Sequence, residues 1–146
     1  MRFNLKINPK AEEYLETSVH AEGEFTQRVK ELVSEYNGEG KIVAYTEDDV
    51  KILSPSEIEC FAVTDGKTEA VTLSGERFRV KRRLYELEQY LPEDFEKISK
   101  SAIANWKKIL KFKVQLSGAV DAVFISGYTE CISRRCFAEL KRRYKL

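Results

Sequence analysis

Two clusters of basic residues are the part of this chain with the clearest potential for chemistry. Residues 97–113 contain six lysines and no acid, and residues 134–145 contain six basic residues and a single glutamate. In the stretch ISKSAIANWKKI (residues 98–109), serines and an asparagine that can hydrogen-bond nucleic acid alternate with the lysines. If strands bring both clusters to one face, that face can neutralise several phosphates, and its affinity will fall steeply with added salt.

The formal net charge of +1 hides a separation of charge along the chain. Residues 1–60 carry 7 lysines and arginines against 13 acids, whereas residues 61–146 carry 18 against 11. A basic second part favours an anionic partner, of which nucleic acid is the commonest. A lysine run is also typical of a solvated strand face, so each cluster taken alone leaves that interpretation open.

Aromatic and arginine side chains within these clusters suggest different kinds of binding. The forked guanidinium groups of Arg134 and Arg135, beside a turn, can read guanine in a groove. Trp106 can stack on a base, which would indicate single-strand or RNA binding. Core packing is the commoner use of a tryptophan between Ile103 and Ile109.

Patterns for catalysis, cofactors and metals are missing from the sequence. There is no glycine loop for phosphate, no serine elbow and no His/Cys pairing, and the acids at 47–49 fall in a predicted turn. Cys60, Cys131 and Cys136 lack metal-ligand spacing and are expected to be buried free thiols, and His20 is the one histidine. We therefore predict no enzyme, no cofactor and no metal. Without an apolar run near ~20 residues or a signal peptide, a cytoplasmic protein is expected.

The first part of the chain shows two periodicities. Residues 3–7 and 15–19 alternate between apolar and polar as two short strands, and residues 24–37 keep the spacing of an amphipathic helix. The sequence thus predicts a small ββα segment over residues 1–46, whose acidic helix offers a regulatory or dimer surface. A non-enzymatic interaction module, docking on a protein or a membrane partner through this helix, is a second interpretation of the chain.

Short strands separated by turn dipeptides fill most of the remaining sequence. Residues 82–91 are predicted to form a short helix, and Ser133 is the expected N-cap of a second. The predicted turns are Asp65-Gly66, Ser74-Gly75, Ser117-Gly118 and Ser126-Gly127. We predict a mainly β domain (α+β overall) with two short helices over residues 47–146.

The order of these parts resembles the LytTR DNA-binding domain of bacterial transcription regulators. A helix rich in Leu and Glu precedes Leu-Pro, an aromatic residue, a basic run and an apolar pair before Asn, and SRR opens the last helix. The matching residues are Leu84, Leu87, Leu91-Pro92, Phe95, Lys97-Ile98, Ser101, Ile103-Ala104-Asn105 and Ser133-Arg134-Arg135. The resemblance implies an elongated, multi-sheet β domain whose loops enter successive grooves along one face of duplex DNA.

Residue roles follow from the resemblance position by position. It implies base readout by Lys100 and Arg135, with a third reader at Lys67 or Thr68. The residues expected to contact phosphate or to support the readers are Ser99, Ser101, Asn105, Lys107, Ser133 and Arg134. Many family members have His-Arg where this chain has Ser99-Lys100, and lysine offers a mobile point charge in place of a fork.

The resemblance also implies partners. Residues 1–46 are too few for a receiver domain, so the layout resembles small free-standing regulators. These are often encoded beside a small integral membrane protein that restrains them. The expected function is a bacterial transcription regulator that binds double-stranded promoter DNA at imperfect direct repeats, as a homodimer or as a pair of monomers.

Overall fold

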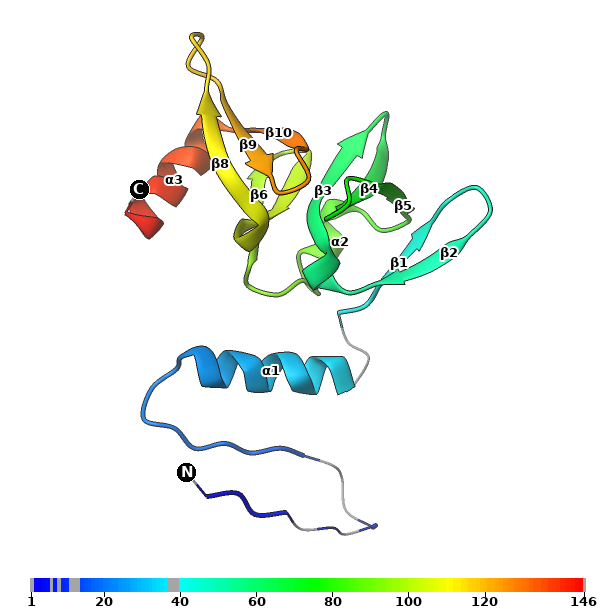
Figure 1. Ribbon diagram of the computed structural model, residues 1–146, viewed down its shortest axis with the longest axis vertical. Helices are drawn as coiled ribbons and strands as arrows, with labels where there is room; N and C mark the ends of the chain where they lie inside the picture. The colour runs from blue at the N-terminus through cyan, green and yellow to red at the C-terminus, as the bar shows by residue number, and fades with distance from the viewer. Residues whose placement is uncertain (1, 6, 8, 11–13, 37–39, 146) are drawn as a thin grey trace. The chain divides into compact units, whose positions relative to one another are not determined.

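The chain folds into two compact units, Met1–Asn37 and Gly38–Leu146. The structure, a computed structural model, describes residues 2–5, 7, 9, 10, 14–36 and 40–145 (Figure 1). The described strands are β1 (Ile42–Tyr45), β2 (Val50–Leu53), β3 (Ile58–Thr64), β4 (Lys67–Thr72), β5 (Arg77–Val80), β6 (Phe95–Ser99), β7 (Ala102–Asn105), β8 (Ile109–Val114), β9 (Val120–Phe124) and β10 (Thr129–Ile132). The described helices are α1 (Glu24–Tyr36), α2 (Leu84–Leu87) and α3 (Arg134–Tyr144).

The first unit contains α1, as predicted, but not the two predicted strands. None of the described residues before Glu24 lies in a strand, and Phe3 and Ile7 are 88% and 83% exposed. The prediction is therefore wrong for the described residues. Alternation alone does not make a strand, because a two-stranded ribbon without a covered apolar face is marginal in water.

The second unit is built on an antiparallel sheet with the strand order β2-β1-β5-β4-β3-β7-β6. Residues 58–62 of the central strand β3 are all buried, because both faces of the sheet are covered. Successive side chains enter different cores: Phe61 and Ile103 belong to one, and Cys60 and Ala104 to the other. β1 pairs with β5 in this sheet, so it lies in the second unit.

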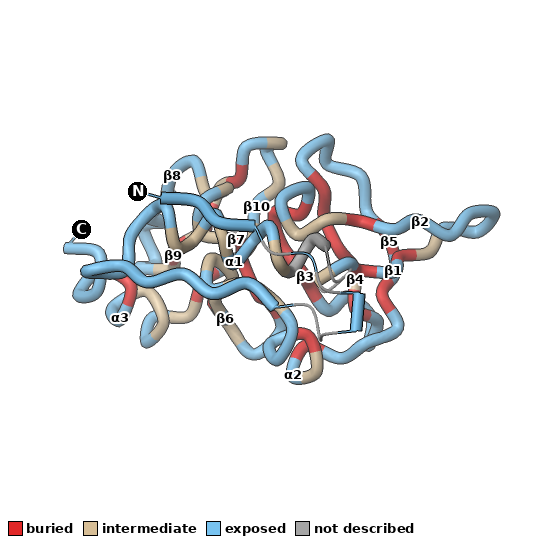
Figure 2. The backbone as a smooth tube through the Cα atoms, turned by 90° about the horizontal axis from the view of Figure 1, so that it is seen from below, coloured by how far each residue is buried: buried red, intermediate tan, exposed pale blue. Residues whose placement is uncertain are grey.

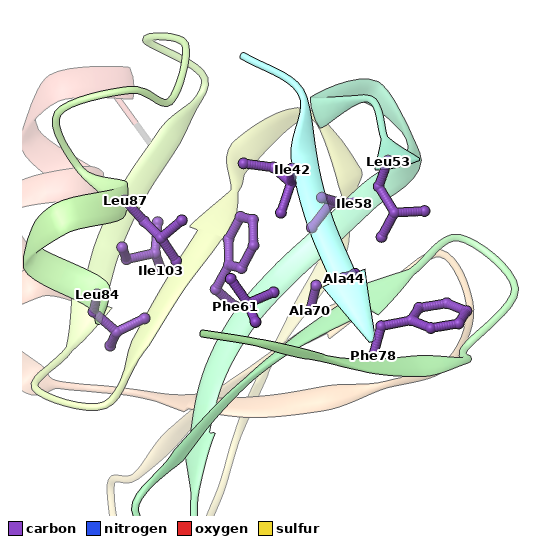
Figure 3. Close-up of a cluster of buried hydrophobic side chains, with 11 residues drawn as sticks. Ile42, Ala44, Leu53, Ile58, Phe61, Ala70, Phe78, Leu84, Leu87 and Ile103 are labelled. Carbon is purple, nitrogen blue, oxygen red and sulfur yellow. The ribbon is translucent and has the colours of Figure 1, made fainter. Parts of the chain in front are cut away.

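On one face of the large sheet, α2 and the sheet's own β1–β2 hairpin contribute to a single hydrophobic core. Leu84 and Leu87 of α2 are buried in a cluster with Phe61, Ile103 and Phe78 (Figure 3). The helix is shorter than the predicted 82–91. After Leu87 the chain turns more tightly, since the N–H of Gln89 donates to Glu86 O and that of Tyr90 to Leu87 O, three residues back.

The other face is covered by a second sheet, of order β10-β9-β8, and by α3. Phe124 and Ile132 of the small sheet and Leu140 of α3 pack there against Ile98 of β6. In the small sheet buried positions alternate with intermediate ones along β9, whereas in the large sheet they run consecutively in β3 and β7 (Figure 2). The predicted mainly β domain with two short helices is confirmed for the second unit.

Polar contacts join the large sheet to the turn between β9 and β10. The carboxylate of the fully buried Glu59 accepts the backbone N–H of Ser126 at 2.7 Å and its hydroxyl at 2.6 Å. Beside it the guanidinium of Arg77 lies 5.0 Å from the ring centre of Tyr128, whose hydroxyl donates to Glu130. Burial and the bond to Glu130 raise the pKa of Tyr128 well above its usual range. The turn between β9 and β10 is therefore fixed to β3.

Candidate nucleic-acid interface

Lys100 occupies the exposed turn between β6 and β7. The backbone N–H of Ser101 donates to the hydroxyl of Ser99 at 3.2 Å, and the two hydroxyls lie 3.4 Å apart. These bonds shape the turn and leave the Lys100 side chain at its tip. The structure thus gives Ser99 and Ser101 the expected supporting place, with Lys100 accessible.

The turn between β3 and β4 lies at the same end of the sheet. The N–H of Val63 donates to Ser101 O at 2.8 Å, and Thr64 pairs with Lys67 across the Asp65-Gly66 turn. Both residues proposed as third reader are thereby brought beside the Lys100 turn. Lys67 is exposed, whereas Thr68 is only 8% exposed, so Lys67 is the better placed to reach a base.

The start of α3 is attached to β6 by a backbone hydrogen bond. The N–H of Ser133 donates to Ile98 O at 2.7 Å, and the hydroxyl of Ser133 caps the helix by accepting the N–H of Cys136 at 3.2 Å. The predicted N-cap is confirmed. Arg135 lies two residues beyond Ser133, and Lys100 lies two residues beyond Ile98, so this bond connects the segments of both predicted readers.

The two arginines that follow Ser133 point to different neighbours. The guanidinium of Arg134 donates to Ser117 O at 3.5 Å, in the turn between β8 and β9. The Arg135 side chain is 89% exposed, and its Nε lies 3.5 Å from Glu139. Both arginines are exposed, but Arg135 contacts a residue of its own helix, whereas Arg134 contacts the turn between β8 and β9.

Asn105 and Lys107 lie at the opposite end of β7 from Lys100. Asn105 is 4% exposed, donates to Ile58 O at 3.1 Å and accepts the N–H of Lys107 at 3.2 Å. It supports the fold and has no surface to offer a phosphate. The ammonium of Lys107 lies 3.3 Å from Asp94. The structure does not bring either residue to the readers.

Sequence reasoning missed two cations beside Lys100. Arg83, Lys97 and Lys100 line one groove of about 340 Å³ on the α2 face of the large sheet. The other lining residues are Val63, Gly66, Thr68, Leu84 and Tyr85. The Arg82-Arg83 pair before the helix was the available signal, but only the packing of α2 on the sheet brings Arg83 next to the β6–β7 turn.

Comparison with known proteins decides the family. The LytTr DNA-binding domain family matches residues 48–145. The chain belongs to the LytTR family. A solved LytTr DNA-binding domain from Bacillus cereus, 19% identical with a TM-score of 0.66, covers 75% of this chain and 100% of its own, which confirms the fold.

Relatives that align with the whole chain support a role in transcription. Two Staphylococcus aureus proteins named HTH-type transcriptional regulators, from strains MSSA476 and MRSA252, are 30% and 29% identical over 147 residues. Each alignment covers 100% of this chain and 99% of the relative. A DNA-binding regulator of transcription is therefore the function that family and relatives support, and the interaction-module alternative is not favoured.

Trp106 of the LytTR domain is engaged by other aromatic rings. Its ring stacks on Tyr144 of α3 at a centroid distance of 4.3 Å and lies 5.7 Å from Phe112. The hydroxyl of Tyr144 donates to Glu96 at 3.0 Å. Trp106 is half-buried, so the structure favours packing over base stacking at this position.

Cysteine and metal chemistry add nothing to the candidate interface. Cys60 is fully buried, and burial raises the pKa of its thiol. Cys131 is exposed, against the prediction of buried thiols, because it lies on the outer side of the edge strand β10. The described residues include no group of three or more potential metal ligands. No helix of the described chain is long and apolar enough to cross a membrane.

Proposed function

We propose that this LytTR protein regulates transcription by binding double-stranded promoter DNA through three reader segments: the β3–β4 turn, the β6–β7 turn and the start of α3. The observation that carries the proposal is a pair of backbone hydrogen bonds, from Val63 to Ser101 and from Ser133 to Ile98. Both bonds join the other segments to residues 98–101. Strands and hydrogen bonds hold the three segments at a fixed distance from one another. Such rigidity suits recognition in the DNA grooves, since contacts with bases require side chains at defined positions.

In this proposal the exposed cations of the reader segments read bases. Lys100 and Arg135 are the principal readers, and Lys67 is the third. A guanidinium can form two hydrogen bonds with the O6 and N7 atoms of guanine, whereas a lysine ammonium supplies a mobile charge. Ser99 and Ser101 shape the turn, while Ser133 and Arg134 fix the start of the helix.

Substitution of Arg135 tests the proposal. Arg135→Lys keeps the charge and removes the fork, so it should retain non-specific duplex binding and lose most of the discrimination between promoter and random duplex. Arg135→Ala should lose both discrimination and part of the non-specific affinity. The measurement is a fluorescence anisotropy titration with duplex from the region upstream of its own gene, at several salt concentrations.

Two controls make the result decisive. Glu139→Gln removes the carboxylate that contacts Arg135, and it should leave discrimination intact. Lys111→Ala, an exposed lysine of β8, should weaken all duplexes alike. The affinity of a specific protein–DNA complex typically exceeds that of a non-specific one by about 10³ or more. If wild-type protein binds its promoter no more tightly than random duplex at ~150 mM salt, the proposal is wrong.

The proposal extends to partners and location. A regulator of promoters acts in the cytoplasm, where the DNA is. We propose that it binds DNA as a homodimer or as a pair of monomers, and that a small integral membrane protein restrains it.

The first unit offers a surface for such a partner. Within this unit, an open groove between α1 and the preceding segment is mostly apolar, and Leu15, Val19, Val29 and Val33 contribute to it. A short membrane protein encoded in the neighbouring gene would support this part.

A further inference from the structure

The groove on the α2 face has a composition unlike the rest of the candidate interface. Three cations line it, Arg83, Lys97 and Lys100, and none of its lining residues is an acid. They come from three different segments: the residue before α2, strand β6 and the β6–β7 turn. The nearest acid in contact is Glu88, at 4.0 Å from Lys97, which is the limit of an ion pair.

The sheet register explains why these groups converge. Lys97 pairs with Ile103, whose side chain enters the α2-side core, so Lys97 points to the same face. The same alternation from Phe61 to Val63 and from Ala70 to Thr68 places Val63 and Thr68 on that face. The groove is therefore lined by Val63, Thr68 and Lys97 from one face of the sheet, together with Arg83 and Lys100.

Arg83 reaches this groove from a position that the core fixes. Its backbone carbonyl accepts the N–H groups of Glu86 and Leu87 at 3.1 Å, and the next residue, Leu84, is buried. The described contacts include no ion pair or hydrogen bond of its guanidinium. Tyr85 and Thr68 also line the groove, and a hydroxyl is a group that can donate to an anion.

From this geometry we infer that Arg83 and Lys97 bind one backbone phosphate of the DNA strand whose base Lys100 contacts. The inference rests on the proposed function, since it places a phosphate site next to a proposed reader. A phosphate suits the groove because it carries several acceptor oxygens and a negative charge for a guanidinium and an ammonium. Bound there, it fixes the register of the strand without reading sequence.

The test compares neighbouring arginines. Arg83→Ala should lower the slope of log K against log salt by about 0.9 and weaken promoter and random duplex by the same factor. Arg82→Ala is the matched control, because the guanidinium of Arg82 lies 4.6 Å from the ring centre of Tyr90 and does not line the groove. Arg82→Ala should leave the slope unchanged.

Neutral phosphates locate the contact. Promoter duplexes carrying one methylphosphonate at a time should show one position that weakens wild-type binding, weakens Arg83→Ala much less, and has no effect on the double variant Arg83→Ala/Lys97→Ala. That position should neighbour the base pair whose substitution ceases to matter in Lys100→Ala. If wild-type protein discriminates its promoter but Arg83→Ala behaves like Arg82→Ala, this inference is wrong and the proposed function is unaffected. Loss of wild-type discrimination would overturn both.

Free inorganic phosphate offers the groove the same oxygens and charge as a phosphate of the DNA backbone, so it is the alternative ligand. Inorganic phosphate, added to DNA-free protein at constant ionic strength up to about 10 mM, should not shift the thermal midpoint. A shift in wild type that is absent in Arg83→Ala would show that the groove holds a free anion, and the assignment to DNA would fall.

Discussion

Ser126→Ala is expected to be the most destabilising serine substitution in a turn of this domain. The Ser126 hydroxyl donates to the buried carboxylate of Glu59 at 2.6 Å and accepts the N–H of Tyr128 at 3.2 Å. Among the described residues, every buried side-chain nitrogen and oxygen has a partner. The substitution would leave one carboxylate oxygen of Glu59 without its donor, although the N–H of Ser126 still reaches the other oxygen at 2.7 Å.

The magnitude follows from these contacts. A hydrogen bond to a charged group contributes about 1.5–3 kcal/mol, and an unsatisfied buried acceptor costs a similar amount. Because one bond to Glu59 survives, we expect the free energy of unfolding to fall by about 2 kcal/mol. Ser117→Ala in the equivalent turn between β8 and β9 is the control. The Ser117 hydroxyl accepts only a 3.4 Å bond at an exposed site, so about 0.5 kcal/mol or less is expected.

Urea unfolding followed by Trp106 fluorescence measures both variants, because Trp106 packs within the second unit. Equal losses for Ser126→Ala and Ser117→Ala would refute the assigned role of the buried carboxylate. A double-mutant cycle with Glu59→Gln adds a second check, since two residues in contact should show a coupling of about 0.5–3 kcal/mol. Additive losses would mean that the hydrogen bond contributes little.

Two further predictions concern the thiols and the tryptophan. Iodoacetamide should modify Cys131 in the folded protein but Cys60 only after unfolding, because Cys60 is buried and burial raises the pKa of its thiol. Peptide mass mapping measures the labelling, and equal modification of Cys60 and Cys131 in the folded protein would contradict this prediction. Single-stranded DNA should leave Trp106 emission nearly unchanged, because Tyr144 occupies its stacking face, whereas Tyr144→Ala should shift the emission to the red. Strong quenching of the wild type by single strands, with weaker quenching by duplex, would instead favour the single-strand function.

The second unit could be predicted from sequence because its signals are local. Turn dipeptides such as Asp65-Gly66 supply the backbone conformation that a hairpin needs, and Gly66 adopts a φ of +73°. Ser133 precedes a helical run and does cap α3. The first unit could not be predicted in the same way, because a strand exists only with a partner, and alternation at residues 3–7 and 15–19 does not specify one.

The candidate interface was only partly predictable, for a similar reason. Lys100 and Arg135 were found because short motifs around them match the family. Arg83 and Lys97 were missed because their proximity to Lys100 depends on how α2 and β6 pack on the sheet. Asn105 and Lys107 lie close to Lys100 along the chain, yet β7 carries them to the far end of the sheet. Closeness in sequence is therefore a poor guide to closeness on a β surface.

Strand β3 links the parts on which the proposed DNA recognition depends. Ile58 O accepts the amide of Asn105, Glu59 holds the β9–β10 turn, and Val63 N–H donates to the turn that carries Lys100. Since residues 58–62 are buried on both faces, these three attachments cannot shift independently. The distance between the proposed reader segments is therefore set by β3 and, through the bond of Ser133 to Ile98, by β6, rather than by the proposed readers themselves. A change of reader should alter which base is preferred, whereas a change in the core of β3 should alter which spacing of DNA contacts the domain accepts.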